Sequence, residues 1–121
     1  MGIVAGNVMK IEELSSSEHA GIIAKIVARG KEVLPAGSLL CLYGSRARGD
    51  YRADSDWDLL LLLDKEVINE RDHEKYSYPL FELGWEIGAQ IHPMMFTKKE
   101  WERRRMTPLY DNISREGIVL C

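Results

Sequence analysis

The sequence predicts an α+β fold in which a small mixed β-sheet carries helices mainly on one face. Residues 38–43 and 59–63 are apolar runs that suit strands and are too short for helices of usual length. The second run is five consecutive leucines, the pattern of a central strand buried on both faces. Apolar residues recur at helical spacing in the stretch before Pro35, which predicts a helix ahead of the first strand.

The first half of the chain alternates helix and strand. We expect the first helix to begin at one of the serines at 15–17, as a capping residue, and to end before Pro35. The strand at 38–43 closes at Gly44, where a tight turn is possible. Ser45 is then expected to cap a short helix.

The second half continues with a helix from about Glu70 to Leu83. This helix should bend near Pro79 and end at Gly84. A long strand is expected over residues 85–96. Because proline cannot donate a ladder hydrogen bond, Pro93 indicates that this strand lies at a sheet edge.

The last elements follow from capping patterns. Thr97 and Glu100 have the spacing of a capping box, which predicts a short helix after the third strand. Residues 108–116 should form a final helix that Gly117 ends, and residues 118–120 a short strand.

Length and composition limit the functions that the chain can have. Its 121 residues predict a single domain, 1–121, and its net charge of −3 makes nucleic acid an improbable partner. The two cysteines, Cys41 and Cys121, are too few for a disulfide framework, so a reducing compartment such as the cytoplasm is expected. No run approaches the roughly 20 apolar residues of a membrane span, and Met1–Met9 does not resemble a signal peptide.

The turn after the first strand is a candidate phosphate-binding site. Gly44 allows the backbone to approach a ligand closely, and the free N–H groups of a helix that begins at Ser45 attract anions. Arg46 and Arg48 add positive charge beside the turn. Taken alone the pattern is common, because many Gly-Ser turns follow strands and bind nothing.

Asp56 and Asp58 are candidate metal ligands at the mouth of the leucine strand. Side chains two apart on a strand point to the same face, so both carboxylates project together and Trp57 projects the other way. Two carboxylates this close favour a cation between them, and Mg²⁺ prefers such oxygen ligands. The alternative is a polar loop whose aspartates face water.

The ordered combination resembles a known family. Gly44-Ser45, Gly49 and then Ser55-Asp56-Trp57-Asp58-Leu59 are similar to the signature of the nucleotidyltransferases typified by DNA polymerase β, in particular the small stand-alone bacterial and archaeal members called minimal nucleotidyltransferases. The resemblance covers most of the chain. It implies a triphosphate held at Gly44, Ser45, Arg46 and Arg48. It also implies two metal ions, Mg²⁺ or Mn²⁺, on Asp56 and Asp58.

One position departs from the family pattern. The strand that leads to Thr97 usually carries a third carboxylate, and His92 occupies that place here. A histidine can act as a general base near neutral pH, so His92 is a candidate catalytic residue. It can equally be a strand histidine without a catalytic role. By alternation along the expected strand, Glu86 and Gln90 would share its face.

Two functions stay open at this stage. The first is transfer of a nucleoside monophosphate, most often AMP, from a nucleoside triphosphate to a hydroxyl acceptor. The second is an impaired nucleotide-binding or partner-binding module, such as the antitoxin-like member of a two-protein pair. The resemblance further implies a separate helical partner of the HEPN type, with a self-dimer as the alternative. Four aromatic residues are expected to cover the sheet rather than stack on a base: Tyr76, Tyr78, Phe81 and Trp85.

Overall fold

The computed structural model of the protein describes residues 10–121, with side chains from Ser17 onward, so the expectation about Met1–Met9 lies outside the described residues. In chain order its elements are α2 (Lys10–Val33), β1 (Leu39–Tyr43), α3 (Ser45–Arg48), β2 (Trp57–Leu63), α4 (Glu70–Asp72), the π-helical turn η1 (His73–Ser77), α5 (Tyr78–Ile87), β3 (Ile91–Thr97), α6 (Lys98–Arg103), α7 (Pro108–Glu116) and β4 (Ile118–Val119).

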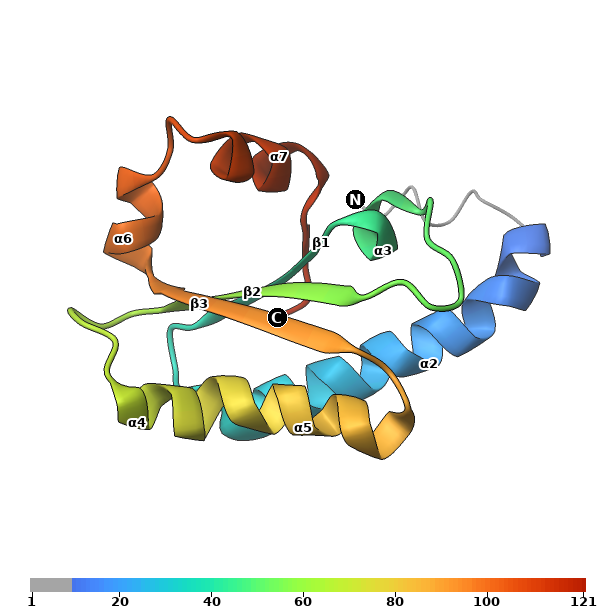
Figure 1. The fold of residues 1–121 in the computed structure, drawn as a ribbon, viewed down its shortest axis with the longest axis horizontal. Coiled ribbons are helices and arrows are strands. Elements are labelled where there is room, and N and C mark those ends of the chain that lie inside the picture. The colour runs from blue at the N-terminus through green and yellow to red at the C-terminus, as the bar shows by residue number, and fades with distance from the viewer. Residues whose placement is uncertain (1–9) are drawn as a thin grey trace.

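The strands form one mixed sheet, which confirms the predicted fold class. Its order is β3-β2-β1-β4. β1 runs antiparallel to β2 and β4, whereas β2 and β3 are parallel. The longest helices, α2 and α5, lie along one face of the sheet, and α6 and α7 lie on the other side (Figure 1). In the part of the chain that the structure describes, no helix is both long and apolar enough to cross a membrane.

Alternation along the strands divides the core between the two faces of the sheet. One set of buried side chains joins the sheet to α2 and α5: Ile26, Leu40, Leu42, Trp57, Leu59, Leu61, Leu80, Leu83 and Ile91. The other set joins the sheet to α6 and α7: Cys41, Leu60, Leu62, Trp101 and Ile113. The leucine run is therefore buried on both faces, as the sequence predicts.

The boundary between α5 and β3 differs from the prediction. Gly84 does not end the helix, and residues 85–87 belong to α5 rather than to a long strand. A β-carbon at Gly84 would lie 2.5 Å from the carbonyl oxygen of Ala89, so this glycine permits close packing of the chain. Gly88 is the residue that ends the helix, in the left-handed conformation at φ 72°.

Two predicted helix starts are also wrong. α2 runs through the serines at 15–17 instead of beginning there. The residue that caps α3 is Gly44, and Ser45 is the first helical residue with no side-chain cap. By contrast, Pro93 does lie on an edge strand, and the capping box of Thr97 and Glu100 is present. The predicted irregularity near Pro79 appears as the π-helical turn η1 just before it.

Candidate active site

Asp58 lies near the start of the interior strand β2 and Asp56 directly precedes that strand; this end of the sheet is called the aspartate edge below. Asp58 is paired in register with Tyr43 at the end of β1 and with His92 on β3. Alternation places Asp58 on the same face as Leu60 and Leu62, the side covered by α6 and α7. The carboxylates are therefore at the open end of that face, beside the turn that follows β1.

Gly44 brings this turn against the aspartate pair. Its backbone has φ 80° and ψ −160°, a combination that is almost restricted to glycine. A β-carbon at Gly44 would collide with the Oδ2 atom of Asp58. Ser45 follows at once as the first residue of α3. The structure thus joins the Gly-Ser turn and Asp58 in one site, as the order of the motif predicts.

The surroundings of Asp58 disfavour the ionised form of its carboxyl group. Burial is the main cause that raises the pKa of the Asp58 carboxyl, and the neighbouring Asp56 raises it further. The charges of His92 and Arg48 act in the opposite direction. Burial and Asp58 together also raise the pKa of Tyr43. A partly buried carboxyl with a raised pKa beside a second carboxylate marks this place as a candidate functional site.

His92 lies beside the carboxylates, in the position predicted from the sequence. Its Nε2 atom is 3.5 Å from Oδ2 of Asp56, and both side chains are about half exposed, at 52% and 47%. Glu86, which was expected on the same strand face, is instead on α5 and forms an ion pair with Arg29 at 3.0 Å. Of His92 and Glu86, it is therefore His92 that lies beside Asp56.

Arg46, which is expected to bind phosphate, has its guanidinium bonded within the protein. Its side chain is buried, at 8% exposure, and its guanidinium donates hydrogen bonds to the carbonyl oxygens of Ala53 and Ser55 at 3.0–3.3 Å. The same group lies 4.6 Å from the ring centre of Tyr51 and 4.4 Å from that of Trp57. Arg46 therefore holds the loop that leads to Asp56, a positioning role that its charge alone did not reveal.

Arg48 is exposed at the other end of the same turn. It forms ion pairs with Asp50 at 3.1 Å and with Glu116 on α7 at 3.0 Å. These hydrogen bonds raise the pKa of its guanidinium, first through Asp50 and then through Glu116. Asp50 is exposed, whereas the side chain of Glu116 is only 23% exposed, so one of the two partners of Arg48 is partly buried.

His19 is a neighbour of the site that the sequence did not single out. Its ring stacks on Tyr51 at 4.1 Å and packs against Trp57 at 4.7 Å. Burial, followed by the charge of Arg46, lowers the pKa of His19 to about 4. The imidazole is therefore neutral at pH 7, which allows it to lie beside a guanidinium. The contact joins α2 to a loop 30 or more residues away on the chain, and no local pattern signals it.

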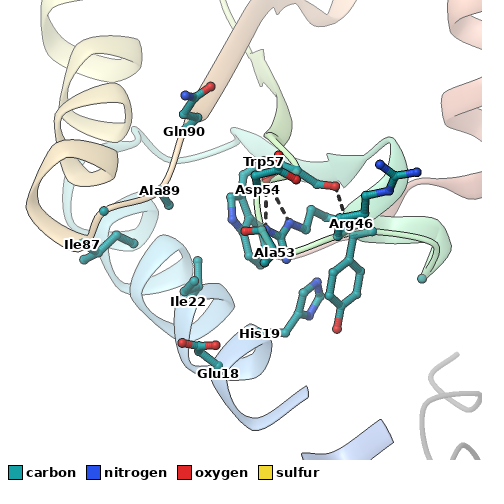
Figure 2. Close-up of a pocket in the computed structure, with 15 residues that line it drawn as sticks. Glu18, His19, Ile22, Arg46, Ala53, Asp54, Trp57, Ile87, Ala89 and Gln90 are labelled. Atoms are coloured by element: carbon teal, nitrogen blue, oxygen red, sulfur yellow. Dashed lines mark hydrogen bonds between the residues drawn. The ribbon is translucent and has the colours of Figure 1, made fainter. Parts of the chain in front are cut away.

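A cavity of about 820 Å³ lies beside this stack, and neither Asp56 nor Asp58 lines it. Figure 2 shows His19, Arg46 and Trp57 grouped on one side of it. Trp57 points away from the aspartates, so the cavity is on the opposite side of β2 from the carboxylates. Of the residues that line this cavity, Arg46 already donates hydrogen bonds to the carbonyl oxygens of Ala53 and Ser55.

The donor set at the aspartate edge fits a divalent cation. Two carboxylates and an imidazole are all established metal ligands. Within the described residues, no three histidine, cysteine, aspartate or glutamate side chains converge closely enough to form a metal site alone. Magnesium and manganese sites of this kind normally take water and substrate phosphate oxygens as further ligands, so an incomplete protein set agrees with that chemistry.

Comparison with known proteins shows the family of the chain and agrees with its fold. Residues 22–119 match the nucleotidyltransferase domain family, so the chain belongs to that family. A crystal structure described as a toxin-antitoxin with AMP-PNP has a TM-score of 0.60 and 19% identity, over 82% of this chain and 72% of that one. A crystal structure described as a mutant of the toxin-antitoxin MntA-HpeT has a TM-score of 0.60 and 16% sequence identity, over 82% of this chain and 72% of that one. At such identities the likeness shows the fold, and no curated protein matches the chain.

Proposed function

We propose that this protein transfers a nucleoside monophosphate, most often AMP, from a nucleoside triphosphate to a hydroxyl acceptor. The observation that carries the proposal is the contact between Gly44 and Asp58, with Asp56 beside them. Gly44 has a backbone conformation that is almost restricted to glycine, and it lies against an aspartate whose pKa is raised. Both features cost free energy of folding, which favours a functional site over an ordinary surface. Membership of the nucleotidyltransferase domain family supports the same reaction class.

In the proposed reaction the acceptor hydroxyl gives up its proton, for which His92 is the candidate base, and its oxygen forms a bond to the α-phosphorus. The bond from that phosphorus to the bridging oxygen breaks, and pyrophosphate leaves with the electron pair. Asp56 and Asp58 would hold the two divalent cations, Mg²⁺ or Mn²⁺, which supply charge neutralisation at the phosphates when they are bound. Gly44 and Ser45 would receive the triphosphate at the turn, and Arg48 would add positive charge at its exposed end.

Arg46 would act on nucleotide binding through the loop. Its hydrogen bonds to Ala53 and Ser55 fix the backbone immediately before Asp56. Because the loop already holds Asp56 in place, Asp56 loses less conformational entropy when the metal and the nucleotide bind, and this strengthens their binding. His92 keeps its predicted role as the candidate general base, since it occupies the position of the usual third carboxylate beside Asp56.

A second candidate function is nucleotide binding without turnover, as in an antitoxin-like member of a protein pair. The observation that favours it is again His92, because a histidine in place of a carboxylate changes the ligand set. The intact pair of Asp56 and Asp58 favours the enzyme. A scaffold gains nothing from two adjacent carboxylates that repel each other.

We also propose a protein partner that supplies the acceptor, with a self-dimer as the alternative. The two solved structures of the same fold are described as toxin-antitoxin proteins. The chain offers an apolar surface for such a partner, because the aromatic side chains expected to cover the sheet are exposed on α5: Tyr78, Phe81 and Trp85. Cys41 and Cys121 are free thiols, which supports a reducing compartment such as the cytoplasm.

Labelled nucleotide tests both the reaction and the partner. The tagged protein is incubated with α-³²P-labelled triphosphates, Mg²⁺ or Mn²⁺, and lysate of its native cell. We expect a labelled acceptor, release of pyrophosphate, and retention of the acceptor on the tagged chain. An Asp58→Asn variant serves as the control and should label nothing. Triphosphate binding without any labelled product would favour the binding module, and light scattering of the isolated chain would identify a self-dimer.

A further inference from the structure

We infer that Glu116 is a positioning residue for nucleotide binding, because it holds the guanidinium of Arg48 beside the Gly44 turn. The inference rests on the proposed function, in which Arg48 adds positive charge next to the triphosphate. Glu116 is the last residue of α7 and lies 68 residues from Arg48 along the chain. Their contact therefore joins the C-terminal helix to the segment that would receive the nucleotide.

The backbone of Arg48 is fixed to the Gly44 turn. Its N–H group donates a hydrogen bond to the carbonyl oxygen of Gly44 at 3.0 Å. Gly44 itself lies against Asp58, so Arg48 begins one hydrogen bond away from the aspartate edge. The Arg48 side chain is 46% exposed. Because an arginine side chain has about 2 kcal/mol of rotamer entropy, the groups that hold the guanidinium decide its direction.

The two acidic partners of Arg48 differ in how firmly they can hold it. Asp50 is 63% exposed and accepts a hydrogen bond from Nε at 3.1 Å. Glu116 is 23% exposed, and both of its carboxylate oxygens accept from Nη1, at 3.0 and 3.3 Å. A pair that is partly shielded from water is screened less by salt than an exposed one. Glu116 is therefore the partner that orients the guanidinium.

The fold holds Glu116 in place from both sides. Ile113, one turn earlier on α7, is buried in the core. Gly117, the next residue, donates a backbone hydrogen bond to the carbonyl oxygen of Ile113 at 2.7 Å. A β-carbon at Gly117 would lie 2.9 Å from Sγ of Cys41 on β1, so the chain is packed closely against the sheet there. A carboxylate fixed in this way can orient its partner with little loss of entropy.

Arg48 keeps donors for a phosphate group while Glu116 holds it. A guanidinium has five N–H donors. Among the side chains that the structure describes, the acceptors of Arg48 lie at Nε and Nη1, and none lies at Nη2. Nη2 can therefore donate to a phosphate oxygen without loss of the Glu116 contact, and a phosphate can also displace the exposed Asp50.

The opposite role for Glu116 would be a brake, in which its carboxylate competes with the phosphates for Arg48. The two roles predict changes of opposite sign. Isothermal titration of the full chain with ATP and Mn²⁺ measures them in Glu116→Gln and in the matched control Asp50→Asn, which removes the same charge from the same guanidinium. Glu116→Gln should raise the Kd of ATP roughly fivefold, the upper end for a surface ion pair. Asp50→Asn should not raise it.

Two further measurements separate positioning from a structural role of Glu116. Inorganic triphosphate with Mn²⁺ has no base, so Glu116→Gln should weaken its binding by the same factor as that of ATP. In an Arg48→Ala background, Glu116→Gln should no longer weaken binding of either ligand. Urea midpoints of all variants establish that each is folded at the titration temperature.

The possible results of these titrations are distinct. Equal or tighter ATP binding by Glu116→Gln would overturn the inference and leave the proposed function standing. A loss of affinity that persists in the Arg48→Ala background would also overturn it, because Glu116 would then act by another route. A wild-type chain that binds neither ATP nor inorganic triphosphate would overturn the inference together with the proposed function.

Discussion

Asp58→Asn is expected to abolish metal-dependent binding of nucleoside triphosphate and to leave the fold intact. The change removes one of two candidate ligand charges and keeps the shape of the side chain. Asp56→Asn should have the same effect on binding. Isothermal titration of ATP with Mn²⁺ or Mg²⁺ measures this. Unchanged affinity in both variants would mean that the pair is ordinary surface.

The same substitution should stabilise the protein at pH 7. The pKa of Asp58 is raised in the folded chain by burial and by Asp56, so its ionised form favours unfolding. In the wild type the protonated Asp58 carboxyl favours the folded state. This contribution to stability is fully present below the unfolded pKa of Asp58 and is lost as the pH rises through its folded pKa. Asp58→Asn should not show that loss. Thermal melts from pH 3 to pH 7 compare the two proteins, and a less stable variant at pH 7 would contradict the assignment.

Arg46→Ala is expected to have the largest effect on stability. It removes a buried guanidinium from the carbonyl oxygens of Ala53 and Ser55 and from two aromatic rings. Hydrogen bonds to a charged group and cation–π contacts of this kind together stabilise by about 3 kcal/mol. The variant should also bind triphosphate weakly, because the loop before Asp56 loses its support.

Arg52→Ala is the matched control for this prediction. Arg52 lies in the same loop and carries the same charge, and it is exposed. Its removal should change the free energy of unfolding by less than about 0.5 kcal/mol. Arg46→Lys keeps the charge and loses the planar fork, so it should resemble Arg46→Ala. Equal urea midpoints for Arg46→Ala and Arg52→Ala would show that Arg46 does not hold the loop.

The arrangement of the aspartates was predictable because strand alternation is a local rule. It placed Asp56 and Asp58 opposite to Trp57, and the two core clusters divide in that way. The order of the motif likewise indicated that the Gly44 turn meets Asp58. These features depend on spacing along the chain and on the pairing of neighbouring strands, so the sequence contains them.

Features that depend on distant packing were not predictable. Arg46 was expected to face a phosphate, and only the folded loop shows that carbonyl oxygens surround it. His19 carries no motif, yet tertiary contact stacks it on Tyr51. Trp85 was expected to cover the sheet, whereas continuation of α5 past Gly84 leaves it 75% exposed. In each case the deciding contact joins residues that no sequence window contains together.

Paramagnetic broadening by Mn²⁺ with ATP tests the central claim most directly. In a ¹⁵N-labelled sample of this 121-residue chain, amide signals of Gly44, Asp58 and His92 should broaden first. Signals of α4, which follows the opposite end of β2 from Asp58, should persist (Figure 1). Broadening centred on His19 and its cavity, or no selective broadening at saturating nucleotide, would contradict the claim that the aspartate edge binds the triphosphate and its metal.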